Sequence, residues 1–206
     1  FLSPQLEQMP EHTLMVQNVA IRQLQEAARA SGDRLFQVSE EVPEDLWLVN
    51  GAVEPVLTVS STEWHRLRLV MAGVSRWLWL DFGQCQVALL AKDGIYIDDF
   101  PRWISHVSLP PGGRADVVAR CPGSKDGLEH TVNSHDWPGV WPKSYVGPLF
   151  SIRSFQGSKS APKREHLEPW RPQRRPGYLR DLRDQSADCA CKTMLHMRWI
   201  DDLLFR

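Results

Sequence analysis

Residues 46–120 decide the fold, and they contain the segments LWLVNG (46–51), EWHRLRLV (63–70), RWLWLDF (76–82), QVALLA (86–91) and RADVVAR (114–120). Polar and apolar residues alternate in several of these segments, which is typical of a strand with one face in a core. The segments are short and are separated by Gly, Pro, Asn and Asp. They therefore predict an antiparallel β-sandwich or a Greek-key barrel.

The first segment ends in Asn50-Gly51, the dipeptide that best tolerates the positive φ angles of a type I′ turn. It predicts a hairpin here, followed by a short strand at 56–59. In the segment 63–70, a period of two places Trp64, Arg66 and Arg68 on one face of a half-buried strand and Leu67 and Leu69 on the other.

Outside this stretch we expect a strand at 12–17, a helix at 21–30, a strand at 103–109 and a closing strand at 149–155. The helix is followed by Gly32, a usual helix stop. Its apolar residues recur at helical spacing and are expected to pack on the barrel: Ile21, Leu24, Ala27 and Ala28.

Four of the segments resemble a known family when they are taken in order. VNG (49–51), WHRLRLV (64–70), AKDG (91–94) and LPPGGRADVV (109–118) follow one another as in the second cupredoxin-like domain of multicopper oxidases. The resemblance covers 46–120, extends back to Pro10 and weakens after Cys121. One departure is Met71-Ala72, where the family usually has Asn-Ala.

The resemblance implies a mainly β, cupredoxin-like Greek-key sandwich with one short peripheral helix and a long irregular C-terminal tail. It divides the chain into a cupredoxin-like domain (1–156), a linker rich in Pro and Arg (157–188) and the truncated start of a third domain (189–206). Since 206 residues are too few for three such domains, we expect a fragment. Its expected partners are the missing first and third cupredoxin domains.

By the same resemblance, the parent is a laccase-like enzyme that takes single electrons from its substrate at a blue copper. It reduces dioxygen to water at a trinuclear copper cluster, and it is expected to be secreted or extracytoplasmic. The second domain of this family is usually a copper-free spacer, so a structural role is expected for this chain.

The histidines agree with a copper-free role. The trinuclear cluster takes eight imidazoles, typically as His-x-His pairs whose rings leave one face of a strand. None of the seven histidines lies two residues from another, and no His-Cys-His segment occurs: His12, His65, His106, His130, His135, His166 and His196. We expect copper in the parent and none in this chain, so whether the chain by itself is an enzyme stays open.

Other metal and redox chemistry depends on the four cysteines. Cys189 and Cys191, with His196 nearby, could bind Cu(I) or zinc, but no fourth ligand is adjacent. Cys85 and Cys121 lie in or beside predicted strands and are either buried thiols or disulfide partners. Four cysteines allow three pairings, and the sequence does not choose between them.

Structural roles are expected for five residues of the resembling motifs: Trp64, Arg66, Arg68, Arg114 and Asp116. They would fix the barrel and its domain contacts, with Arg68 and Asp116 as the salt bridge to test. Trp137 and Trp141 either border the substrate side or pack a long loop onto the barrel. His130 and His135 are interpreted as flanking a polar turn in a surface loop near Asp136.

Net charge separates the body of the chain from its tail. Residues 1–150 carry 12 Lys and Arg against 18 Asp and Glu, and residues 151–206 carry 12 against 7. The basic tail is interpreted as a solvated linker, although a nucleic-acid-binding barrel is a rival. A non-catalytic cupredoxin-like binding or assembly module is the other alternative. No apolar run reaches the length of a membrane span.

Overall fold

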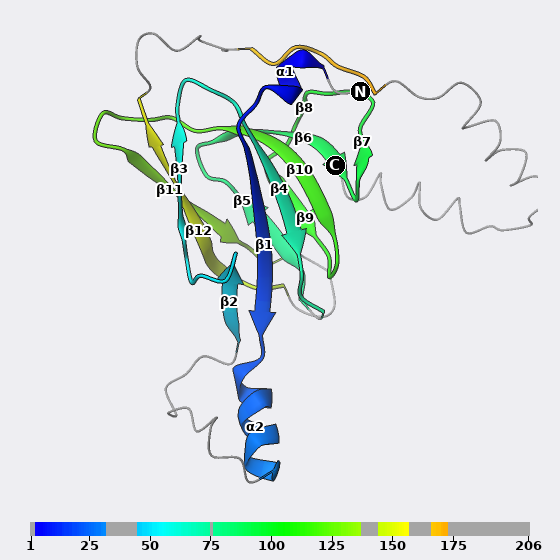
Figure 1. Cartoon of the computed structure of the whole chain (residues 1–206), viewed down its shortest axis with the longest axis vertical. Coiled ribbons are helices and arrows are strands. Elements are labelled where there is room, and N and C mark those ends of the chain that lie inside the picture. The colour runs from blue at the N-terminus through cyan, green and yellow to red at the C-terminus, as the bar shows by residue number, and fades with distance from the viewer. Residues whose placement is uncertain (1–2, 32–44, 75, 137–143, 157–165, 173–206) are drawn as a thin grey trace, which may run out of the picture. The chain divides into compact units, whose positions relative to one another are not determined.

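The computed structural model describes residues 3–31, 45–74, 76–136, 144–156 and 166–172, which form a two-sheet β-sandwich with two helices (Figure 1). The strands are β1 (Glu11–Val19), β2 (Leu46–Val49), β3 (Val56–Ser60), β4 (His65–Met71), β5 (Leu78–Asp81), β6 (Gln86–Lys92), β7 (Ile95–Tyr96), β8 (Arg102–Trp103), β9 (His106–Leu109), β10 (Arg114–Arg120), β11 (Leu128–Ser134) and β12 (Gly147–Phe155). This architecture confirms the prediction of a mainly β, cupredoxin-like sandwich.

The larger sheet has the strand order β2-β1-β4-β10-β6-β7, and β8 also pairs with β6. The smaller sheet has the order β3-β12-β11-β5-β9. Both sheets are mixed, because β1 pairs with β4 and β12 pairs with β3 in parallel. The sequence predicted an antiparallel sandwich, and these two parallel pairs differ from it, since alternation along a strand does not specify its distant neighbour or the direction of that neighbour.

The Asn50-Gly51 turn forms as predicted, with φ angles of 52° and 81°. The amides and carbonyls of Val49 and Ala52 bond each other across it at 2.8 and 3.1 Å. The predicted hairpin does not form, because β2 pairs with β1 whereas β3 pairs with β12 of the other sheet. The turn therefore begins a crossover between the sheets.

Two further segments differ from the prediction. The single strand expected at 103–109 is divided into β8 in the larger sheet and β9 in the smaller sheet. The polar turn expected between His130 and His135 is the end of β11, which pairs with both β12 and β5. Its polar residues Thr131, Asn133 and the flanking charges hid the alternation that a half-buried strand normally shows.

The two helices are α1 (Pro4–Glu7), which was not predicted, and α2 (Ile21–Ser31), which confirms the predicted helix. The expected packing of α2 on the barrel was wrong. Leu24 is 46% exposed and Ala27 is exposed, while Ala28 is buried. Within the described parts of the chain, neither helix is long and apolar enough to cross a membrane.

Apolar side chains gather in two places. The main core lies between the sheets and includes fully buried residues of both: Leu67, Leu69, Val117, Leu80, Leu109, Phe150 and Ile152. A second cluster contains Leu6, Met9, Trp64, Ala88, Leu90, Phe100, Val118 and Leu167. Residues 166–171, orange in Figure 1, pass beside α1 and supply Leu167 to this second cluster.

Candidate functional site

Two arginines of β4 organise the outer face of the larger sheet. Arg66 donates from Nη2 to Asp116 Oδ2 of β10, and its Nη1 lies 3.2 Å from Glu11 Oε2 of β1. Arg68 Nη1 lies 3.2 Å from Glu11 Oε1, and its Nε lies 3.7 Å from Asp116 Oδ1. Both carboxylates are therefore shared by both arginines. The expected Arg68–Asp116 pair exists, but Asp116 makes its close contact with Arg66.

Burial separates the two arginines. The side chain of Arg66 is 8% exposed, whereas that of Arg68 is 49% exposed. Burial acts to lower the pKa of Arg66, but the hydrogen bond and the negative charge of Asp116 outweigh it, and the pKa is raised. Arg66 is thus held as a buried cation by its carboxylate partner, while Arg68 keeps much of its hydration.

Tyr96 of β7 completes the network. Arg66 Nη2 donates to the Tyr96 hydroxyl at 3.1 Å, and the guanidinium carbon lies 6.0 Å from the ring centre. A pocket of ≈ 360 Å³ adjoins these groups, with Arg68, Tyr96, Arg114 and Asp116 among its lining residues. Its charged lining residues are two arginines and one aspartate, and Thr13 and Tyr96 contribute hydroxyl groups. The arrangement links charged side chains of β1, β4 and β10 to the hydroxyl of Tyr96 on β7.

The other two motif residues, Trp64 and Arg114, lie outside this network. Trp64 is 2% exposed in the second apolar cluster, and the Arg120 guanidinium lies 4.8 Å from its ring centre. Arg114 is exposed, and its amide donates to Asp93 Oδ1 at 2.8 Å. That bond braces the turn at Asp93 and Gly94, whose φ angles are 49° and 85°. Trp64 and Arg114 therefore lie in separate places, one in the second apolar cluster and one beside the turn that joins β6 to β7.

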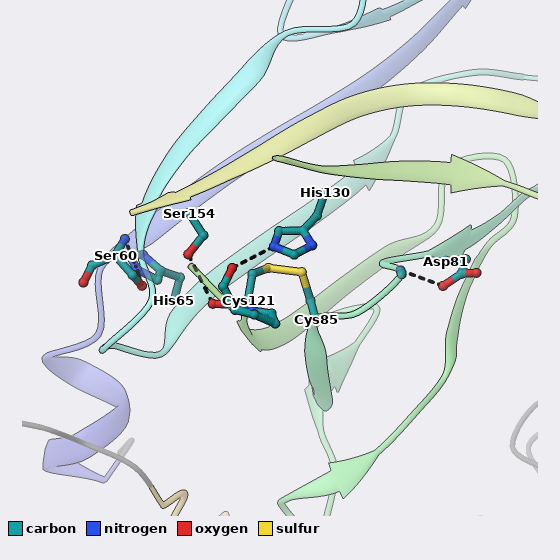
Figure 2. Close-up of a disulfide and its surroundings, with 9 residues drawn as sticks. Ser60, His65, Asp81, Cys85, Cys121, His130 and Ser154 are labelled. Atoms are coloured by element: carbon teal, nitrogen blue, oxygen red, sulfur yellow. Dashed lines mark hydrogen bonds between the residues drawn. A yellow bond between two sulfur atoms is a disulfide. The ribbon is translucent and has the colours of Figure 1, made fainter. Parts of the chain in front are cut away.

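The sequence left the disulfide open, and the structure forms it between Cys85 and Cys121 (Figure 2). Gln86 of β6 lies across from Arg120 of β10, so the bridge joins the next pair of residues beyond the sheet ladder. The Cα atoms of the bridge are 4.1 Å apart. The disulfide thus ties the beginning of β6 to the end of β10.

Two side chains of the smaller sheet reach the backbone beside this bridge, as Figure 2 shows. Ser154 Oγ donates to the Cys121 carbonyl at 3.1 Å, and His130 Nε2 lies 2.8 Å from the Pro122 carbonyl. Ser154 is fully buried and His130 is 7% exposed. These two bonds join the smaller sheet to the end of β10 beside the bridge, a role for His130 that the expected surface loop did not predict.

The imidazoles do not assemble a copper centre in the described part of the chain. No three His, Cys, Asp or Glu side chains there are grouped so that they could hold a metal ion. His135 Nε2 lies 3.4 Å from Asp81 Oδ2, and its ring centre is 6.1 Å from that of His106. Among residues 3–31, 45–74, 76–136, 144–156 and 166–172, these imidazoles occur in pairs and do not form a larger ligand group.

His12 and His65 form a second imidazole pair that the sequence did not indicate. His12 Nε2 and His65 Nδ1 are 3.2 Å apart, and His65 Nε2 lies 3.2 Å from the amide nitrogen of Ser60. Burial lowers the pKa of both rings. The parallel pairing of β1 with β4 brings the two rings together, so only knowledge of that pairing could have revealed them.

Several predicted residues lie outside the described residues. They are the tryptophans of the expected substrate-side loop, Trp137 and Trp141, and the candidate metal ligands, Cys189, Cys191 and His196.

Comparison with solved structures places this geometry among known folds. The chain is 22% identical to a multi-copper oxidase from Pseudomonas thermotolerans, with a TM-score of 0.56 over 81% of this chain and 36% of the other. The chain has the fold of one part of a multicopper oxidase. The McoA multicopper oxidase of Aquifex aeolicus gives a TM-score of 0.59 at 15% identity, over 82% of this chain and 36% of McoA.

A bacterial laccase-like multicopper oxidase from Ochrobactrum sp., described as active towards lignin model compounds, gives a TM-score of 0.54 at 16% identity. That match covers 80% of this chain and 34% of the oxidase. The chain therefore spans about a third of the length of these multicopper oxidases. No protein-family model and no curated protein sequence matches it.

Proposed function

We propose that this chain is the copper-free middle domain of a laccase-like multicopper oxidase, in which it has a structural and interdomain role. The observation that carries the proposal is the likeness in fold to about a third of each of several multicopper oxidases. The missing His-x-His and His-Cys-His segments support a domain that leaves copper chemistry to its partners.

In this proposal the partners are the first and third cupredoxin domains, joined to residues 1–156 directly or through the linker 157–188, with 189–206 beginning the third domain. Five residues of β4, β10 and their surroundings support the domain: Trp64, Arg66, Arg68, Arg114 and Asp116. Copper and the four-electron reduction of dioxygen belong to the parent. The disulfide Cys85–Cys121 fits an oxidising, extracytoplasmic compartment.

Copper analysis tests the proposal. The purified chain and the product of the longest transcript that contains it are compared by elemental analysis and by visible absorption of a blue copper centre. We expect copper and oxidase activity in the longer product and no stoichiometric copper in the chain. Stoichiometric copper in the chain overturns the proposal and directs attention to Cys189, Cys191 and His196. Copper in neither protein also overturns it and favours a binding or assembly module.

A further inference from the structure

Residues 166–171 lie on the domain as an extended peptide lies on a receptor. We propose that α1, Trp64 and the segment 96–100 form a peptide-binding groove for a Leu-x-x-Trp segment. Residues 166–171 fill this groove in cis, and the same segment is the occupant when it is offered in trans. The proposal rests on contacts within this chain and does not depend on the copper oxidase role.

The side chain of Gln5 makes hydrogen bonds with the backbone of the segment. Gln5 Nε2 donates to the His166 carbonyl at 2.9 Å, and Gln5 Oε1 accepts from the Glu168 amide at 3.0 Å. One side chain thus bonds the carbonyl of one residue and the amide two residues later, as a neighbouring β-strand would. Pro169 restricts Glu168 to extended conformations, which favours this geometry before docking.

The backbone of the groove makes a further contact at the other end of the segment. The Trp170 amide donates to the Phe100 carbonyl at 3.1 Å, and the two residues form an isolated antiparallel bridge. The segment is therefore recognised partly by strand-like pairing, which supplies affinity without regard to side chains.

Two side chains of the segment provide selectivity. Leu167 is 9% exposed and packs in the cluster with Leu6, Met9 and Trp64. Trp170 is half-buried and meets the Tyr96 ring edge to face, with ring centres 5.3 Å apart. The spacing of these two anchors fits a leucine and an aromatic residue three positions later. A peptide without them would keep the backbone bonds but lose the apolar burial that dominates affinity.

Occupancy in cis hides the groove from an added peptide. Because the segment belongs to the same chain, its effective concentration at the groove is on the order of millimolar. A peptide in trans therefore binds measurably only when the cis segment loses its anchors. The Leu167→Ala/Trp170→Ala chain, here called the vacated variant, removes them and leaves the groove residues unchanged.

The test measures fluorescence anisotropy of a labelled peptide with the sequence of residues 165–172, titrated with full-length chains. We expect the vacated variant to bind it at least about tenfold more tightly than the wild-type chain does. The same peptide with both anchors replaced by alanine should not bind, and Gln5→Ala in the vacated variant should weaken binding. Equal binding by wild type and vacated variant, or no binding to a folded vacated variant, overturns the proposal.

A second measurement tests the proposal if the vacated variant does not fold. In the wild-type chain, hydrogen exchange should show the Glu168 and Trp170 amides protected, and Gln5→Ala should speed the exchange of both while leaving β4 amides unchanged. Gln5 is half-buried and is not a member of the second apolar cluster, so this change leaves that cluster's side chains in place. Exchange of the Trp170 amide at the rate of an unstructured peptide in the wild-type chain overturns the proposal.

Discussion

Asp116 lies directly across from Arg68 in the strand register, yet its carboxylate makes its close hydrogen bond with Arg66, two residues along β4. The diagonal neighbour prevails because Arg66 is buried and its guanidinium cannot be solvated by water. Asp116 is therefore the main partner of Arg66 and only a distant partner of Arg68.

Replacing Arg66 and Arg68 one at a time should show that they contribute differently to stability. Arg66→Ala leaves the Asp116 carboxylate without its close partner, so we expect the free energy of unfolding to fall by about 3 kcal/mol. Arg68→Ala removes a half-exposed pair, so the loss should be under about 1 kcal/mol. Urea denaturation of the two variants measures both values. Because the arginines lie on one strand and share both carboxylates, each is the matched control of the other, and equal losses would contradict the assigned difference.

The Cys85–Cys121 bridge should contribute strongly to stability. It closes a loop with a sequence separation of 36, which corresponds to roughly 3–4 kcal/mol in the chain-entropy account. Denaturation of the Cys85→Ala/Cys121→Ala chain, compared with the wild-type chain, measures this loss. Peptide mapping without reductant should find Cys85 linked to Cys121. A map that joins either residue to Cys189 or Cys191 would refute the pairing.

The imidazole pair predicts a loss of stability in mild acid. Burial holds the pKa of His12 and of His65 below 6.5, so the unfolded chain takes up protons first as the pH falls through that value. The pair's contribution is complete above this window and is lost progressively as the pH falls toward the lowered pKa values of the folded state.

Denaturation at about pH 7.5 and about pH 5.5 tests this sign. The His12→Gln/His65→Gln chain should lose less stability between these pH values than the wild-type chain. His166→Gln, which changes an exposed ring, is the control and should follow the wild type. An unchanged pH dependence in the double variant would show that other groups cause the acid sensitivity.

The Asn50 side chain should stabilise β1 as well as its own turn. Its Oδ1 accepts from the Met15 amide and its Nδ2 donates to the Thr13 carbonyl, both at 2.9 Å. Asn50→Gly keeps the positive φ angle and loses these bonds, so we expect a loss of about 1–2 kcal/mol. Asn50→Ala loses the bonds and adds backbone strain, so its loss should be larger. A thermal or urea melt orders the two variants, and an unchanged Asn50→Gly melt would remove the proposed role of the side chain.

Sequence reasoning reached many of the strands because their determinants are local. Alternation in β4 and β10, the turn residues Asn50-Gly51 and the helix at 21–30 depend on neighbours along the chain. The strand β11 was not predicted, because only its local pattern could have revealed it and polar residues obscure that pattern. The resemblance to multicopper oxidases likewise came from the order of short motifs, and the fold agrees with it.

Local sequence was enough to predict a mainly β chain, the alternating faces of β4 and the positive φ angles of the Asn50-Gly51 turn, and it contains no His-x-His pair. Three features could be read only from the packed strands: β1 lies parallel to β4, Cys85 is bonded to Cys121, and Asp116 is the close partner of Arg66. The residues of each of these pairs lie far apart along the chain. These contacts join residues whose attraction depends on burial and register, and both arise only when separate strands are packed together.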